Sequence, residues 1–203
     1  MSVTLFIIIL TAGVSIMAFN NQELFHKWKL SPYMVVNRKE WYRIFTHAFI
    51  HADWVHLFFN LFVLYMFGEN TELFMKREFG ATQGTFLFLL LYVGGIAFAA
   101  LPAVIRHGNN VVYSSIGASG AVAGVLFASI LFFPLMELML LILPIPIPAY
   151  IFGPLYLAAE YYLDKRGNDN VAHDAHFFGA LFGFFFPIAF RPDLFLRFIS
   201  ALI

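Results

Sequence analysis

The chain has 203 residues, of which 61% are hydrophobic and 12% are charged, with 27 Phe and no Cys. An average soluble domain carries roughly twice that charged share, so the composition excludes the ordinary soluble class. Lys and Arg number 12 and are balanced by 12 Asp and Glu, which leaves no basic surplus for a nucleic-acid partner. Because only helices and closed barrels satisfy their backbone polar groups in lipid, the long apolar runs predict an all-α membrane protein.

Six apolar runs approach the length of about 20 residues that a helix needs to cross a bilayer. The expected spans are residues 4–19, 56–75, 82–105, 119–133, 148–163 and 176–190. The first five residues hold no Lys or Arg, so the first run lacks the basic start of a secretory signal peptide and is expected to remain as a span. Residues 1–203 contain no internal repeat, and we expect one domain, a bundle of six transmembrane helices.

Two segments between the expected spans have distinctive compositions. Residues 20–55 interleave basic and aromatic side chains, which suits the lipid headgroup layer. Residues 133–150 are an apolar run that prolines interrupt, and we expect a loop or a re-entrant connection there. The prolines are Pro134, Pro144, Pro146 and Pro148. The distribution of Lys and Arg between the two sides does not decide the orientation.

Polar side chains inside apolar spans are costly and are therefore candidates for function. His56 and Asn60 are four residues apart, which places both on one face of a helix, so their donors can converge on one oxygen. Ser119 follows Gly117 and Ala118 at the start of the fourth span, where unpaired backbone N–H groups and the helix dipole favour developing negative charge. Each feature also has a structural explanation, since a serine can bond its own helix and a His–Asn pair can link helices.

His176 starts the last expected span and is the candidate partner of Ser119. The two side chains can meet only where their helices touch closely, and small residues permit such contact. A GxxxG pattern lies beside each side chain, and the glycines concerned are Gly120, Gly124, Gly179 and Gly183. A close helix pair would bring the hydroxyl within hydrogen-bond reach of the imidazole, which is the geometry of a base-activated nucleophile.

These motifs, taken in order, resemble the signature of the rhomboid intramembrane serine proteases. The motifs are His56-xxx-Asn60, Gly117-x-Ser119-Gly120 and Ala175-His176-xx-Gly179. Further residues at spacings familiar from the family are Arg43, Thr46, His51, Gly68 and Glu72. The resemblance covers about residues 41–190. Each motif alone is weak, but their joint occurrence in this order on the expected helices is specific.

The resemblance implies that Ser119 is the nucleophile and His176 the general base, as a dyad without a carboxylate third member. It also implies that His56, Asn60 and the backbone N–H of Ser119 stabilise the oxyanion. Gly117 would give the backbone freedom just before the serine. The mechanism implied needs no cofactor and no metal.

Similar enzymes cut membrane proteins near the exposed end of a transmembrane helix, so the expected partners are transmembrane-helix substrates and the lipid bilayer. Small or helix-breaking residues in a substrate should favour cleavage, because they let the helix unwind and expose its carbonyls. The resemblance further implies a multi-pass protein of the cell membrane with cytoplasmic termini and a site open to the extracellular or periplasmic side. Arg43 and Glu72 are expected to be structural.

Two features depart from the family pattern. The fourth residue after the serine is often aromatic in relatives and packs on the base, but it is Ala123 here. We therefore expect His176 to be held less firmly. The Pro144–Pro148 segment has no counterpart in the family pattern and is expected to alter the gate beside the fifth span.

Other functions stay open at this stage. A metal-dependent membrane protease is suggested by clustered histidines, namely His47, His51, His56, His173 and His176. The HxxxH formed by the first two lacks the Glu at the second position that would act as base. A non-catalytic rhomboid-like protein that binds membrane helices would typically lack the serine or the histidine, and both are present. A channel or transporter would line a path with polar groups, which here gather at one depth.

Two neighbours of His176 are weaker candidates for the catalytic machinery. Asp174 cannot face a residue two positions away on one helix, so it is expected to be an interfacial charge. His173 lies off the Ala-His-xx-Gly pattern and is a poorer candidate for the base.

Overall fold

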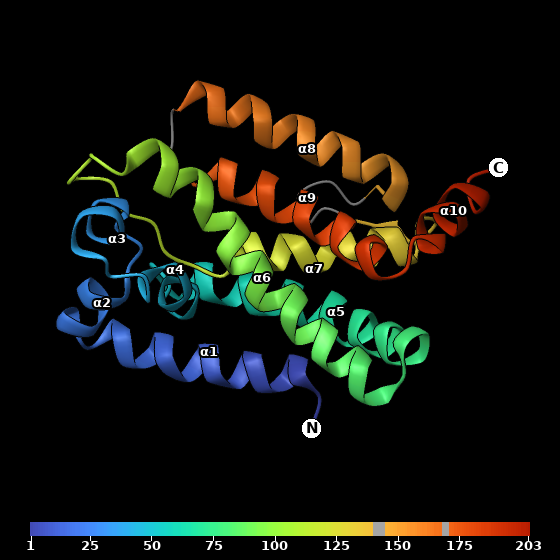
Figure 1. Ribbon diagram of the computed structural model, residues 1–203, viewed down its shortest axis with the longest axis horizontal. Coiled ribbons are helices and arrows are strands. Elements are labelled where there is room, and N and C mark those ends of the chain that lie inside the picture. The colour runs from blue at the N-terminus through green and yellow to red at the C-terminus, as the bar shows by residue number, and fades with distance from the viewer. Residues whose placement is uncertain (140–144, 168–170) are drawn as a thin grey trace.

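A computed structural model describes residues 1–139, 145–167 and 171–203 (Figure 1). These residues form ten α-helices, one 3₁₀ helix and one antiparallel pair of short strands. The elements are α1 (Val3–Phe19), α2 (Gln22–Trp28), α3 (Pro32–Arg38), α4 (Arg43–Thr46), η1 (His47–Phe49), α5 (Trp54–Phe79), α6 (Ala81–His107), α7 (Ser119–Phe132), β1 (Glu137–Leu138), β2 (Ile147–Pro148), α8 (Ala149–Arg166), α9 (His173–Phe190) and α10 (Asp193–Ser200). The helical class expected from the sequence is therefore confirmed.

Six of these helices, α1 and α5 to α9, coincide with the six expected spans, although several are longer than predicted. The largest difference that bears on function is at α9, which begins at His173 and not at His176. His176 therefore lies one turn inside the helix. The polar residues before it belong to the first turn of the helix. The negative charge of Asp174 stabilises this turn, because it interacts favourably with the positive end of the helix dipole.

Length and apolar composition identify fewer spans than the sequence predicts. Among the described residues, α6 alone is long and apolar enough to cross a membrane by itself. Two bent pairs, Arg43–Phe49 with α5 (97°) and α9 with α10 (115°), raise the number to 3 if each pair is one span. The apolar helices α1 and α7 are shorter, with 17 and 14 residues. The six-span count stays a prediction.

Helix α7 is the buried centre of the bundle. Every residue from Gly120 to Leu131 is buried, which fits a helix that is apolar on all sides. It packs most extensively against α9 and also against α5 and α6 (Figure 1). The N-terminal end of α7, where Ser119 lies, is consequently fixed by three neighbouring helices.

Glycines let α7 and α9 approach until their backbones touch. A Cβ added to Gly183 would collide with the backbone of Gly124, and one added to Gly179 would collide with the carbonyl of Gly120. Both GxxxG patterns therefore lie in the interface between these two helices. This contact requires glycine because any side chain would force the helices apart.

Charged and polar groups hold the ends of the bundle. At one end, Arg191 of the α9–α10 corner pairs with Glu78 of α5 at 2.6 Å. The buried Glu72 accepts hydrogen bonds from the backbone N–H and hydroxyl of Thr4 at 2.9 and 2.8 Å, which fastens α5 to α1. Toward the opposite end, the guanidinium of Arg43 donates to Glu40 at 2.6 Å and to two backbone carbonyls of the first loop. Each of these contacts fastens separate helices or segments to one another.

The proline-containing connection is partly described. Glu137 pairs with Pro148 and Leu138 with Ile147 in the β1–β2 ladder, so residues on both sides of the connection lie together. Within the Pro144–Pro148 segment expected to alter a gate, Pro144 lies outside the described residues and residues 145–148 are described.

Candidate active site

Ser119 is the first residue of α7, and the loop before it is tightly shaped. Gly117 has φ +105, a conformation that L side chains rarely adopt. Its backbone N–H donates to the carbonyl of His47 at 2.9 Å, which ties the loop to the segment before α5. Ser119 is thus presented at a helix N-terminus by a fixed loop, beside N–H groups that have no partner within the helix.

The structure brings Ser119 and His176 together. Oγ of Ser119 lies 2.7 Å from Nε2 of His176, although the residues are 57 positions apart in the chain. The close α7–α9 contact explains the distance, because Gly120 and Gly179, which follow Ser119 and His176 by one and three residues, touch each other. A hydroxyl at this distance from an imidazole can pass its proton to the ring as it attacks an electrophile.

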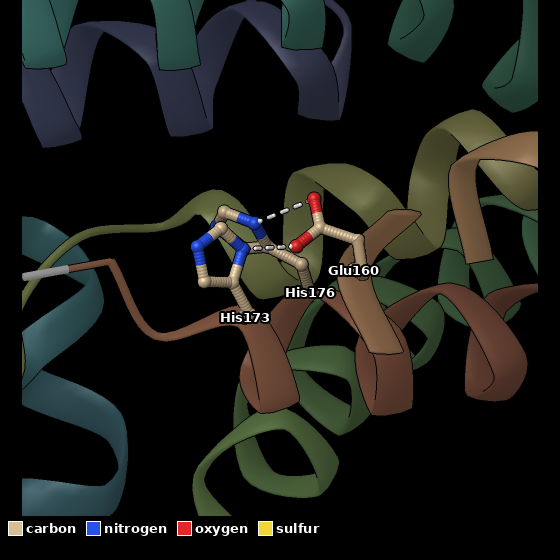
Figure 2. Close-up of side chains that lie close together, drawn as sticks. All are labelled: Glu160, His173 and His176. Atoms are coloured by element: carbon tan, nitrogen blue, oxygen red, sulfur yellow. Dashed lines mark hydrogen bonds and ion pairs between the residues drawn. The ribbon is translucent and has the colours of Figure 1, made fainter. Parts of the chain in front are cut away.

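The other ring nitrogen of His176 faces a carboxylate that the sequence argument missed. Nδ1 of His176 lies 3.1 Å from Oε1 of Glu160 in α8, and Nδ1 of His173 lies 2.6 Å from Oε2 of the same side chain (Figure 2). The resemblance implied a dyad without a carboxylate third member, whereas the structure places the carboxylate of Glu160 beside His176. Both ring nitrogens of His176 have partners, while the expectation that Ala123 leaves the ring less firmly held stays a prediction.

The sequence did contain a signal for Glu160. It is a carboxylate inside the apolar run of residues 148–163, and an ionisable group in such a run is a functional candidate by the same argument that selected Ser119. What the sequence could not supply was its partner, since the facing of α8 against α9 is a tertiary contact.

Asp174 points elsewhere. Its carboxylate accepts from its neighbour, the backbone N–H of Ala175, at 2.8 Å and pairs with Arg106 at 3.3 Å. Its side chain is only 7% exposed, so within the protein it is a buried partner of Arg106; its expected place at the membrane interface stays a prediction. Asp174 does not hold His176.

His56 lies against the loop that presents the serine. A Cβ on Gly117 would be 2.7 Å from Cε1 and 2.8 Å from Nε2 of His56. The backbone N–H of Ala52 donates to Nδ1 of His56 at 3.4 Å, so the neutral ring carries its proton on Nε2, the nitrogen nearer to Gly117. His56 can therefore offer a donor two residues from Ser119.

Asn60 lies one turn further along α5 and is buried. Its amide donates to the carbonyl of His56 at 2.9 Å, which leaves one N–H available. Its carbonyl oxygen has no hydrogen-bond partner among the described residues. Within the same residues, no hydrogen bond joins Asn60 or His56 directly to Ser119.

His51 contacts the loop that precedes Ser119. The hydroxyl of Ser15 donates to the carbonyl of Phe49 at 2.8 Å and therefore accepts from Nδ1 of His51 at 2.9 Å. Nε2 of His51 then accepts from the backbone N–H of Ala118 at 3.4 Å. Burial lowers the pKa of His51 to about 3, so the ring is neutral at pH 7, as this acceptor role requires.

A small cavity lies beside the serine. Its volume is about 20 Å³, enough for about one water molecule. It is lined by the loop before α7 and by Ala99, Ala172 and Ala175, among others.

Ligand atoms of one histidine cluster converge, and those of the other do not. Among the described residues, Glu160, His173 and His176 have ligand atoms within 4.8 Å of one another, an arrangement that could hold a metal ion. Within the same part of the chain, His47, His51 and His56 do not form such a group with a carboxylate. The metal-protease alternative therefore loses its HxxxH site.

The fold and the site define a helical membrane protein with a serine–histidine pair at the N-terminal end of its central helix. The family model described as the Rhomboid domain matches residues 38–193, and the chain belongs to the rhomboid family. The resemblance found in the sequence is confirmed.

Three relatives show the range of similarity. RHOMBOID-like protein 12, mitochondrial, from Arabidopsis thaliana is 30% identical over 193 residues, covering 88% of this chain and 55% of the relative. Rhomboid-like protein 11, chloroplastic, from the same plant is 38% identical over 101 residues, covering 50% of this chain and 32% of the relative. Rhomboid protein 1, mitochondrial, from Saccharomyces cerevisiae is 27% identical over 182 residues, covering 85% and 51%. The chain thus spans about half the length, or less, of these relatives.

Proposed function

We propose that this protein is an intramembrane serine endopeptidase that cleaves transmembrane-helix substrates. The observation that carries the proposal is the 2.7 Å contact between Oγ of Ser119 and Nε2 of His176. A serine in a membrane helix that only satisfied its own hydroxyl would bond a backbone carbonyl of its helix. Here the hydroxyl is directed at a base on another helix.

The reaction would proceed in two halves. Oγ of Ser119 attacks the scissile carbonyl carbon while its proton passes to Nε2 of His176, and the amide C–N bond then breaks as the imidazolium returns that proton to the leaving amine. Water next attacks the acyl ester while His176 takes one of its protons; the imidazolium then returns that proton to Oγ as the ester C–O bond breaks, which releases the carboxylic acid and regenerates Ser119 and neutral His176. This sequence needs no cofactor and no metal.

Backbone and side-chain donors would stabilise the tetrahedral oxyanion. The backbone N–H of Ser119 is at the N-terminus of α7, where the helix dipole favours negative charge. Nε2–H of His56 and the remaining N–H of Asn60 are the side-chain donors we assign. A donor of this kind typically contributes about 3–4 kcal/mol to the transition state.

The setting we propose is a multi-pass protein of the cell membrane. Residues 1–203 would form one domain in which α1 and α5 to α9 are the six spans. The termini would be cytoplasmic, and the N-terminal end of α7 would open to the extracellular or periplasmic side. Partners would be single helices in the bilayer, cut where small or helix-breaking residues let them unwind.

The proposal is tested by cleavage of a single-span substrate in liposomes by the purified protein. Wild type is compared with Ser119→Ala and His176→Ala, each with and without a chelator. The matched control is Ser129→Ala, because Ser129 lies in the same helix, is buried, and has the sulfur of Met136 at 3.9 Å as its side-chain partner. We expect cleavage by wild type and Ser129→Ala and none by the other two variants, with no effect of the chelator.

A folded wild-type protein that binds the substrate helix but never cuts it would contradict the proposal and favour the non-catalytic alternative. Cleavage that survives Ser119→Ala would exclude a serine mechanism at this position.

A further inference from the structure

The side chain of Glu160 joins two histidines of the next helix. It extends from α8, and each of its carboxylate oxygens faces Nδ1 of one imidazole, at 3.1 Å for His176 and 2.6 Å for His173 (Figure 2). His176 continues to Ser119 through its other nitrogen, at 2.7 Å. Glu160, His176 and Ser119 therefore form an unbroken line of hydrogen-bonding atoms across α8, α9 and α7.

The burial of Glu160 constrains where the protons lie. The residue is 8% exposed, and among the described residues its ion-pair partners are the two imidazoles. A carboxylate can only accept hydrogen bonds, and a buried carboxylate without donors is strongly destabilising. The hydroxyl of Tyr156 is a further donor beside this carboxylate, and the short contacts to the two Nδ1 atoms place both imidazoles to donate Nδ1–H to it.

This placement of protons fixes the chemistry of His176. A neutral imidazole with its proton on Nδ1 has a lone pair on Nε2, and Nε2 is the atom beside Oγ of Ser119. The opposite tautomer would point an N–H at the hydroxyl and could not accept its proton. A carboxylate at Nδ1 also stabilises the imidazolium that forms during the attack.

We infer that Glu160 is a positioning residue of the proposed protease, which selects the Nδ1–H tautomer of His176 and so makes its Nε2 the base for Ser119. His173 has a supporting part. By holding Oε2 at 2.6 Å, it keeps Oε1 directed at His176. The inference rests on the proposed function and adds a third member to its serine–histidine pair.

The test compares Glu160→Leu and Glu160→Gln with wild type in the liposome assay, with kcat and KM measured separately. Glu160→Leu removes the acceptor, and we expect kcat to fall on the order of 10³-fold with KM unchanged. Glu160→Gln keeps the shape of the side chain, but its amide N–H can donate to Nδ1 and hold the opposite tautomer, so its kcat should fall by a similar factor. A near-isosteric variant that folds normally and still loses kcat separates tautomer selection from simple occupation of the space.

The matched control is Asp164→Asn, one turn further along α8. Its carboxylate pairs with Arg106 at 3.2 Å and does not contact His176, so it undergoes the same acid-to-amide change in the same helix. We expect wild-type kcat for this variant. Because leucine could also disturb folding, the melting temperature of each variant is measured. If the Leu variant proves to be unfolded, the near-isosteric Gln variant tests the inference in its place.

Three results would overturn the inference. One is wild-type kcat in Glu160→Gln and Glu160→Leu, and another is an equal loss in Asp164→Asn. The third is wild-type activity that a chelator removes and Zn²⁺ restores, because Glu160 would then hold a cation with the two histidines. If wild type itself shows no cleavage that depends on Ser119, the proposed function fails; if wild type cleaves and the Glu160 variants match it, this inference alone fails.

Discussion

The imidazole of His56 occupies the space that a side chain at Gly117 would need. A Cβ at residue 117 would lie 2.7 Å from Cε1 of the ring, closer than real contacts of this kind. The same glycine has φ +105, so its conformation and its contact both exclude a side chain. The loop that presents Ser119 therefore packs directly against His56, the donor assigned to the oxyanion.

Gly117→Ala should impair catalysis more than stability. The methyl group would displace His56 from the serine loop, and loss of one oxyanion donor costs on the order of 10²-fold in kcat. The matched control is Gly80→Ala, because Gly80 also has positive φ, +87, but no atom within 4 Å of an added Cβ. Both variants carry backbone strain, and only the first should lose most of its kcat at a similar melting temperature. Equal kcat in the two variants would contradict this reading of the contact.

Gly183→Ala should separate α7 from α9. Its Cβ would collide with the backbone of Gly124, and neither helix can yield without moving the Ser119–His176 pair. Overpacking of this kind costs about 1–3 kcal/mol. Gly13→Ala in α1 is the control, since nothing lies within 4 Å of its added Cβ, and removal of a helical glycine stabilises by up to about 1 kcal/mol.

The measurements are thermal unfolding in detergent and labelling of the serine by a fluorophosphonate. We expect Gly183→Ala to melt earlier and to label poorly, whereas Gly13→Ala does neither. Wild-type labelling by Gly183→Ala would show that the helix contact does not set the serine–histidine distance.

Stability should fall as the pH is lowered from 7 to 5. Burial lowers the pKa of His51 to about 3 in the folded protein, whereas an unfolded histidine has a pKa of about 6.5. The unfolded state therefore binds more protons below pH 6.5, and protonation there favours unfolding. This contribution of His51 is fully present above pH 6.5 and decreases as the pH falls toward 3. Most carboxylates titrate below pH 5, so the window isolates histidines.

The check is the melting temperature of wild type and His51→Gln at pH 7 and pH 5. The variant should be less stable at pH 7, because it loses hydrogen bonds to Ser15 and Ala118, and should show a smaller decrease between the two pH values. An identical decrease in both proteins would mean that His51 is not the group that titrates.

The proposed orientation can be read with single cysteines, because the chain has none of its own. Val112 in the loop before α7 is 84% exposed, and Leu196 in α10 is 67% exposed. With six spans and cytoplasmic termini, Val112→Cys in intact cells should react with a membrane-impermeant maleimide, and Leu196→Cys should react only after lysis. The reverse pattern would invert the topology, and reaction of both in intact cells would contradict the six-span count.

Much of the candidate site was predictable because it is encoded in local patterns. The pairing of Ser119 with His176 was expected from glycines beside each residue, and those glycines lie in the α7–α9 contact. Glu160 was missed although it lies in an apolar run, because its contact with His176 joins two helices and no local pattern relates the two residues. The support that His51 gives to the loop was also missed, since it depends on Ser15 in a distant helix.

The sequence by itself determined the class of protein, the family and the residues that carry its motifs. Apolar runs select helices, and the order of short motifs along the chain is independent of how the helices pack. Only the tertiary structure decided which residues meet. These contacts join Glu160 with His176, His56 with Gly117, and Asp174 with Arg106. The physical reason is that hydrogen bonds act over about 3 Å. The facing and tilt of whole helices set such distances, and no local pattern records them.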